Sequence, residues 1–332
     1  MFKTNIVVSG IRPTGILHLG HYFGILKTWL KLQTKFPCFF FIADLHAFNT
    51  HYNKYHNIKF NIKSIIIDLL SIGIDPIKST IFIQSKIPEH SELYLLLSMI
   101  TPINWLKRIP SYKSKINKNL TYGFLGYPIL QAADILLYRA NKIPIGKDQI
   151  PHIEIVKKIS KKFNFLYKLN KNFKNNFYFQ KPKIILSKTT CLPGINGLKM
   201  SKSYSNTIGI REKKKSIFKK IMKMRTDPNR KYKYINGNPE ICTVWQFHLI
   251  YSNFKIKKYI NDSCRSSYIG CVECKEIIIN SIYKKQQPIL ENAQKYLDNP
   301  KFVKNIIKEG CLKARKVAKK NIHKIYNIIN KK

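Results

Sequence analysis

The chain has 332 residues, of which 44% are hydrophobic, and a formal charge of +43. This composition supports a folded core in about two domains and excludes wholesale disorder. No apolar run can span a bilayer, and the first residues lack the apolar region of a signal peptide, so a cytoplasmic protein without a membrane partner is expected. The positive charge favours a polyanion such as nucleic acid as a partner, although an AT-rich genome would also enrich lysine.

The first half of the chain alternates short apolar runs with helical patterns. Runs that fit strands cover 5–9, 38–43, 80–84 and 142–145. Helical patterns begin near Gly20 and cover 58–72, 89–100 and 127–138. The alternation predicts an α/β fold with a Rossmann-like, doubly wound parallel sheet, into which the helices at about 86–140 are inserted.

The pattern changes near residue 206. Beyond it helical periodicity dominates, and an apolar stripe with lysines between its members runs from 303 to 329. We therefore expect a catalytic domain over 1–206 and a helical domain over 207–332.

Two short polar motifs carry the chemistry. His18-Leu19-Gly20-His21 opens a helix just after the first strand, and Lys199-Met200-Ser201-Lys202-Ser203 follows about 180 residues later. A helix N-terminus attracts phosphate, histidines can donate hydrogen bonds to it, and lysines on a loop can neutralise charge on a departing pyrophosphate. Together the motifs resemble the HIGH and KMSKS signatures of class I aminoacyl-tRNA synthetases.

Within that class the chain resembles the tryptophanyl-tRNA synthetases over nearly its whole length. The matching segments are 9–15, 73–76, 83–85, 131–138, 146–149 and 152–154. The resemblance implies that Asp134 accepts the indole N–H of tryptophan, since a buried carboxylate left unpaired by phenylalanine would discriminate strongly. It also implies that His46, Tyr127, Gln131 and Gln149 belong to the tryptophan pocket.

The same resemblance implies the nucleotide site. The residues expected to catalyse activation are His18, His21, Lys113, Lys199 and Lys202. The residues expected to bind ATP are Arg12, Pro13, Thr14, Gly20, His21, Gly146, Lys147, Asp148, Leu192, Lys199, Met200, Ser201, Lys202 and Ser203.

Three departures and three alternatives accompany this interpretation. Histidines occupy 18 and 21 where many bacterial members have Thr and Asn, Gln131 replaces a common Met, and Lys147 replaces a common Glu. The closest alternative is a tyrosyl-tRNA synthetase, but Val8 and Arg12 stand where those enzymes usually carry Tyr and Asp. The others are a nucleotidyltransferase that does not aminoacylate and a non-catalytic RNA-binding relative, which would be expected to lose the motif histidines or lysines.

Four of the seven cysteines form a C-x21-C-x6-C-x2-C pattern, namely Cys242, Cys264, Cys271 and Cys274. Thiolates at such spacing suit an iron–sulfur cluster or tetrahedral zinc, and buried free thiols are the alternative. The pattern resembles a bacterial subset of tryptophanyl-tRNA synthetases that hold a structural [4Fe–4S] cluster beside the anticodon-binding surface.

The resemblance finally implies a reaction and its partners. L-Tryptophan and ATP with Mg²⁺ would give tryptophanyl-adenylate, and the acyl group would pass to the 3′ end of tRNA(Trp). A homodimer is expected, with the insertion and 127–138 at its interface. The basic helices of 207–332 would bind the anticodon arm.

Overall fold

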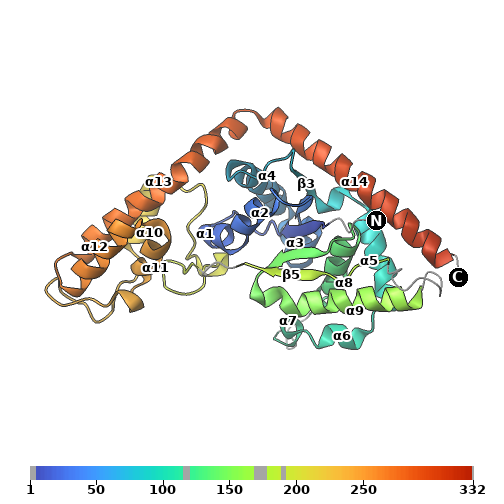
Figure 1. Ribbon diagram of the computed structural model, residues 1–332, viewed down its shortest axis with the longest axis horizontal. Coiled ribbons are helices and arrows are strands. Elements are labelled where there is room, and N and C mark those ends of the chain that lie inside the picture. The colour runs from blue at the N-terminus through green and yellow to red at the C-terminus, as the bar shows by residue number, and fades with distance from the viewer. Residues whose placement is uncertain (1–4, 115–119, 168–177, 188–191, 331–332) are drawn as a thin grey trace.

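The computed structural model describes residues 5–114, 120–167, 178–187 and 192–330 (Figure 1). For residues 54, 55 and 203 the backbone alone is described. The strands are β1 Val7–Ile11, β2 Cys38–Ile42, β3 Ser79–Ile83, β4 Lys142–Ile145 and β5 Lys183–Leu186. They form one parallel sheet in the order β3-β2-β1-β4-β5. The predicted Rossmann-like parallel sheet is confirmed, although β1 begins two residues later than expected and β5 was not predicted.

Twenty helical segments connect or follow these strands in the part of the chain that is described. They are α1 Leu19–His21, η1 Tyr22–Leu26, α2 Lys27–Leu32, α3 Asp44–His51, η2 Tyr52–Lys54, α4 Tyr55–Ser71, η3 Gln84–Lys86, α5 Glu89–Ile100, α6 Ile103–Lys107, α7 Pro110–Lys113, α8 Tyr122–Leu136, η4 Lys147–Gln149, α9 Ile150–Leu166, η5 Lys202–Tyr204, α10 Lys214–Met222, η6 Pro239–Ile241, α11 Thr243–Tyr251, α12 Phe254–Arg265, α13 Cys271–Leu297 and α14 Pro300–Asn330. Among the described helices, none is long and apolar enough to cross a bilayer.

The sheet is covered on both faces, which is why its strands are apolar at consecutive positions. Phe40 of β2 points into the cluster formed with α2 and α4, where Trp29 stacks on it at a centroid distance of 4.2 Å. The next residue, Phe41, points into the opposite cluster. Alternate side chains of a strand face opposite sides, so a sheet buried on both faces needs continuous hydrophobicity.

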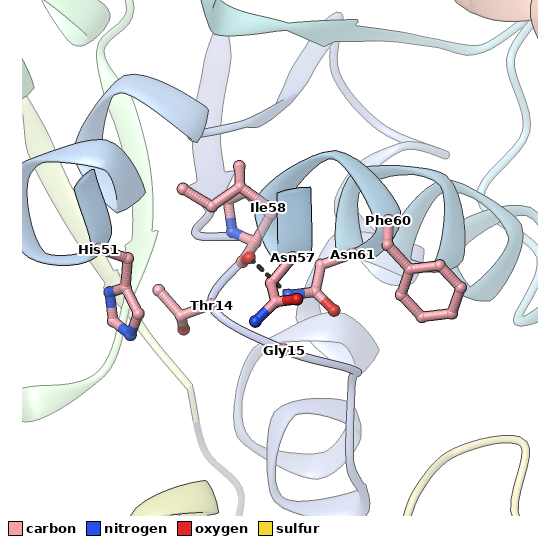
Figure 2. A pocket seen from close by; sticks show the side chains of 8 residues that line it. Thr14, Gly15, His51, Asn57, Ile58, Phe60 and Asn61 are labelled. Atoms are coloured by element: carbon pink, nitrogen blue, oxygen red, sulfur yellow. Dashed lines mark hydrogen bonds between the residues drawn. The ribbon is translucent and has the colours of Figure 1, made fainter. Parts of the chain in front are cut away.

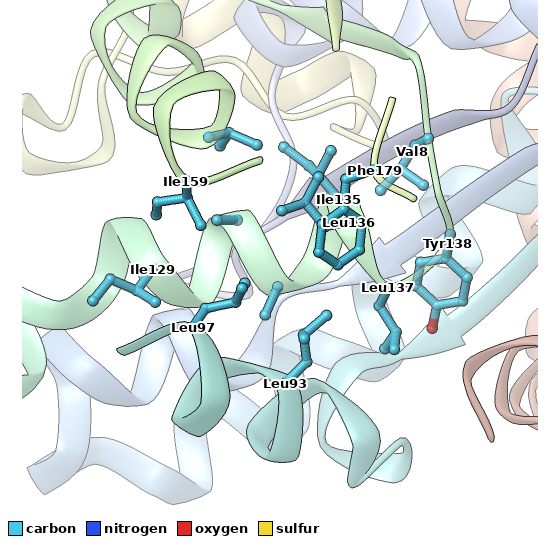
Figure 3. Packing of buried hydrophobic residues seen from close by; sticks show 14 of the residues in the cluster. Val8, Leu93, Leu97, Ile129, Ile135, Leu136, Leu137, Tyr138, Ile159 and Phe179 are labelled. Atoms are coloured by element: carbon cyan, nitrogen blue, oxygen red, sulfur yellow. The ribbon is translucent and has the colours of Figure 1, made fainter. Parts of the chain in front are cut away.

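The second cluster joins the sheet to α5, α8 and α9. Leu97 of α5 lies beside Ile129 of α8 and Leu93 lies nearer Leu137, while Ile159 of α9 lies on the other side of α8 (Figure 3). Most side chains of 129–138 are therefore buried within the chain and are not available to a dimer interface, contrary to the expectation for this segment.

The C-terminal part of the chain first forms an arm, made of α10, α11, α12 and the first half of α13, and then returns to the sheet through α14 (Figure 1). The helices α10 and α11 pack with the first half of α13, whose Ile278 and Ile282 lie in their core, and α12 packs on η6. The second half of α13 packs on α4, and Pro288 lies between the two parts of this helix.

Helix α14 packs along β3, the edge strand of the sheet. Its Gly310 lies so close to the strand that a Cβ there would be 1.9 Å from the carbonyl oxygen of Ile81. Only glycine allows this approach. The last 31 described residues thus cover the sheet edge. The domain boundary at about residue 206 remains a prediction.

Candidate active site

The sheet order fixes where a ligand would bind. After β3 the chain crosses back through α5 and α8 to β4, on the other side of β1. In open parallel sheets ligands bind at the carboxyl ends of the two strands where the order reverses, because the connections diverge there. The loops at that point are 12–18 after β1 and 146–149 after β4, and both contain predicted site residues.

The two signature motifs lie together at this edge. The N–H of Leu19 donates to the carbonyl of Ile208 (2.9 Å), and the N–H of Ile210 donates to that of Leu17 (3.1 Å). This short antiparallel bridge ties the first motif to the segment that follows the second. The backbone N–H of Gly20 points at Sδ of Met200, with 3.3 Å between nitrogen and sulfur. Met200 and Leu19 belong to the same buried cluster.

The two histidines face each other. Their ring centroids are 3.7 Å apart, and the N–H of His18 donates to Nδ1 of His21 (3.2 Å). Burial, together with the charge of Lys202, lowers the pKa of His18 to about 4, and burial lowers the pKa of His21 as well. Both rings are therefore neutral at physiological pH. Nδ1 of His18 is buried and has no hydrogen-bond partner among the described residues, so a bound ligand could satisfy it.

Lys202 lies against the loop that follows β1. A Cβ on Gly15, whose φ is +147°, would be 3.1 Å from Nζ of Lys202. Burial and the neighbouring Arg12 lower the pKa of Lys202 to about 8, against the opposing effect of Asp68. A half-buried ammonium among cations is an unfavourable arrangement that a bound polyphosphate would relieve.

Asn206 holds the second motif in place and was not predicted as a site residue. It is buried, and its Oδ1 accepts from the N–H of Ser201 (2.8 Å). Its Nδ2 donates to Oδ1 of Asn196 (2.8 Å) and to the carbonyl of Lys199 (3.2 Å). The loop that carries both lysines is thus fixed by one side chain.

Asp134 of α8 is 1% exposed and is surrounded by three hydrogen-bond donors. His46 Nε2 donates to its Oδ2 (2.8 Å), while Gln84 Nε2 and His90 Nδ1 donate to its Oδ1 (2.7 and 2.6 Å). Burial alone would raise the pKa of Asp134, but the bonds from the two histidines outweigh it and set the pKa at about 2. His90 is held in turn by Tyr138 (2.9 Å). Sequence reasoning did not assign His90 and Gln84 to the site.

A second polar chain leads from this carboxylate towards the nucleotide loop. The ring of His46 makes an edge contact with Tyr127, whose hydroxyl is hydrogen-bonded to His152. His152 Nδ1 pairs with Oε1 of Gln149 (3.1 Å), and Gln149 Nε2 donates to Asp148 (2.9 Å). The structure thus joins Asp134, His46, Tyr127 and Gln149 in one network, with His152 as an additional member.

The other predicted site residues make fewer contacts with the two motifs and with Asp134. Arg12 lies near enough to lower the pKa of both Lys202 and His152 by its charge. Lys147 and Lys199 are exposed, and Lys113 is exposed at the end of α7 without a hydrogen bond or ion pair to any described residue. Of the remaining predicted residues, Gly146 begins η4, Gln131 is half-buried on α8, Leu192 is buried beside Met200, and Ser203 has a side chain outside the description.

A pocket of about 320 Å³ adjoins the loop after β1. Figure 2 shows Thr14 and Gly15 on one side of it, with His51 of α3 and Asn57 and Asn61 of α4 around them. Asn61 Nδ2 donates to the carbonyl of Pro13 (3.0 Å) and fixes the loop to α4. Predicted ATP-binding residues thus form one wall of an open space.

The four patterned cysteines all lie in the arm. Cys242 precedes α11, Cys264 lies in α12, and Cys271 and Cys274 lie in the first turn of α13. Burial, together with the charges of the other three thiols, raises the pKa of Cys274 to about 12. The thiols are thus within electrostatic reach of one another, although the described residues include no group of three or more His, Cys, Asp or Glu that could hold a metal ion.

A doubly wound parallel sheet with polar loops at its switch point is typical of nucleotide-binding enzymes. The family described as "tRNA synthetases class I (W and Y)" matches residues 3–287. The chain is 43% identical to a tryptophan–tRNA ligase of Thermotoga maritima, with 98% of each chain covered, and 41% identical to one of Ralstonia nicotianae, with 96% of each covered. The crystal structure of tryptophanyl-tRNA synthetase from Campylobacter jejuni, complexed with ADP and tryptophan, superposes with a TM-score of 0.87 at 33% identity, covering 98% of this chain and 99% of that one.

The chain therefore belongs to the class I tRNA synthetases of the tryptophan and tyrosine group. Each of the similar proteins named above carries the name of the tryptophan enzyme, which favours tryptophan over the tyrosine alternative.

Proposed function

We propose that tryptophan is activated with ATP between 18–21 and 199–202. His18, His21 and Lys202 would contact the phosphates there, as the sequence predicts. The chain is an ATP-dependent tryptophan–tRNA ligase. One observation supports this location of the chemistry above all others: the backbone bridge between 17–19 and 208–210, which ties the first signature motif, just after β1, to the segment that follows the second.

The first step is attack of the tryptophan carboxylate on the α-phosphate of ATP, with pyrophosphate leaving. ATP with Mg²⁺ is the usual nucleotide form for such phosphoryl chemistry. His18 and His21 are neutral and each carries one ring N–H, so they can donate to phosphate oxygens without adding charge. Lys202 would neutralise the charge that grows on the leaving pyrophosphate, and loss of one such donor costs on the order of 100-fold in rate.

Asp134 would select tryptophan by its indole nitrogen. A carboxylate has about four lone-pair directions, and three of those on Asp134 are used by His46, Gln84 and His90. Oδ1 accepts two of these bonds and Oδ2 only one, so the remaining direction is on Oδ2. An indole N–H fits it, whereas a phenylalanine ring would leave it empty.

Pyrophosphate exchange with each of the twenty amino acids tests this proposal. We expect exchange with tryptophan alone, and its loss in Lys202→Ala. Exchange with tyrosine instead would show that Asp134 reads a phenol hydroxyl. Full exchange in Lys202→Ala would show that Lys202 takes no part in the activation reaction.

We propose further that the four patterned cysteines hold a structural [4Fe–4S] cluster. A single zinc ion needs all four sulfurs within about 2.3 Å of one point. The four thiols are near enough to affect the pKa of Cys274, which supports a shared site, and the C-x21-C-x6-C-x2-C pattern favours an iron–sulfur cluster over zinc. When bound, the cluster would cross-link α11, α12 and α13.

Iron and sulfide analysis of protein purified without oxygen tests the cluster. We expect close to four irons per chain, and their loss in Cys264→Ala. Colourless, iron-free enzyme with full aminoacylation activity would contradict the proposal.

We propose a homodimer that acts in the cytoplasm, where tRNA is charged. Its support is a set of exposed apolar side chains on one side of the inserted helices: Leu95, Met99, Ile103 and Tyr122. Leu95 and Met99 lie four residues apart on α5 and so share one face of that helix, and Ile103 begins the next helix, α6. Exposed apolar side chains of this kind are typical of an interface. Met99→Lys should yield monomers in sedimentation, whereas Ile77→Lys, at an even more exposed position elsewhere, should not.

A further inference from the structure

The segment between α10 and α11 exposes two aromatic rings that no part of the mechanism uses. Tyr232 and Tyr234 are stacked with centroids 5.5 Å apart and planes 4° from parallel. They are 61% and 77% exposed. Large rings are usually at least partly covered, and a pair arranged in parallel in water is typical of a binding surface.

The loop that carries the pair is rigidly held. Arg230 is 8% exposed, and its guanidinium donates to the carbonyls of Lys233 and Ile269, both at 2.8 Å. Ser267 Oγ donates to the carbonyl of Tyr234 (3.1 Å). The rings are thus fixed by their backbone from both sides, and binding to them costs little ordering entropy.

The ends of the loop are held equally well. Asp227 accepts from the backbone N–H groups of Asn229 (2.8 Å) and Asn238 (2.7 Å), and the N–H of Gly237 donates to the carbonyl of Cys264 (2.9 Å). The loop is therefore attached to the helix that carries one of the patterned cysteines. A loop this well held that still exposes its aromatic rings is built to present them.

The charges beside the rings identify the kind of partner. Lys231 and Lys233 alternate with the tyrosines and are exposed, and the whole chain carries +43. Aromatic faces that stack on bases, together with cations that contact phosphates, are how proteins bind single-stranded nucleic acid. A protein partner with acidic side chains would not need parallel rings.

We propose that Tyr232 and Tyr234 form a stacking platform for unpaired loop bases of the tRNA, with Lys231 and Lys233 on the adjoining phosphates. This inference rests on the proposed location of the chemistry. The 3′ end of the tRNA has to enter the cleft beside β1, whereas the platform belongs to the arm formed by α10 to α12, beyond the far end of α13 (Figure 1). The unpaired bases that can reach the arm are therefore those of the anticodon loop.

The test compares Tyr232→Ala/Tyr234→Ala with the matched control Tyr232→Phe/Tyr234→Phe in the full-length enzyme. Stacking contributes roughly 1–3 kcal/mol per base. We expect the alanine variant to raise KM for tRNA(Trp) transcript at least about tenfold, and the phenylalanine variant to stay within about twofold. Thermal unfolding should be unchanged in both variants.

Two readouts separate this proposal from the one it rests on. Pyrophosphate exchange needs no tRNA and should be normal in the alanine variant; loss of exchange in the unaltered enzyme would instead refute the proposed site. The alanine variant should also lose the preference for tRNA(Trp) over a transcript with a changed anticodon. Unchanged KM and preference would overturn the platform, as would an alanine variant whose sedimentation shows that the rings join two copies of the chain.

Discussion

Lys202 gives the sharpest prediction because its ionisation should be visible in the rate. Burial and Arg12 lower the pKa of its ammonium to about 8 in the enzyme without ligand. The charged form binds phosphate, so it is present below that pH and is lost as pH rises through 8. At pH 9 about a tenth of the enzyme would keep the charge, and kcat/KM for ATP should fall about tenfold there. Bound triphosphate favours the ammonium, so the corresponding fall in kcat should lie at higher pH.

The measurement is pyrophosphate exchange at subsaturating and saturating ATP between pH 6.5 and 10. Lys202→Arg is the matched variant, because a guanidinium remains charged over this whole range. Its activity should be lower in absolute terms, since Arg differs in shape, but the alkaline fall should disappear. An alkaline fall at the same pH in the arginine variant would assign the titration to another group and refute the reasoning.

Three further changes test the parts of the site and the fold. Asp134→Asn should raise KM for tryptophan on the order of 100-fold while KM for ATP changes little, and equal changes in both would mean that the carboxylate only maintains the fold. Asn206→Ala removes three hydrogen bonds from the lysine loop and should lower stability by about 3 kcal/mol and kcat at least tenfold, measured by urea unfolding and exchange. Gly310→Ala should lower the free energy of unfolding by about 1–3 kcal/mol, because its methyl group would clash with the backbone of Ile81. The control Gly24→Ala has no atom within 4 Å and should keep the original melting temperature. Equal melting temperatures of both variants would show that α14 can shift freely.

Much of the sheet could be predicted because its strands are buried on both faces. Runs such as 38–43 are apolar at successive positions, and this signal is local. The strand β5 was missed although β4 is equally short; β5 lies at the edge of the sheet, where Ile184 and Ile185 are only half-buried, so its burial is weaker than that of the inner strands.

The candidate site was predictable where motif and spacing determine it. His18 and Lys202 come from signatures whose residue types follow from phosphate chemistry. By contrast, Gln84 follows β3, and His90 lies in α5, and they meet Asp134 only because the helices pack on that end of the sheet. Asn206 is a common loop residue, and its role depends on which backbone groups the fold leaves within its reach. These residues meet only in the tertiary structure, so a local sequence pattern cannot predict their contacts.

The long helix α13 packs with two separate parts of the molecule, which affects where it can bend. Its first part is buried among the helices of the arm, and its second part lies on α4 beside the sheet. Proline has no N–H to donate, so at Pro288 the helix lacks a bond just where it passes from one body to the other. The helix bends most easily at that residue, so the arm can tilt about it while the two signature motifs keep their positions relative to each other.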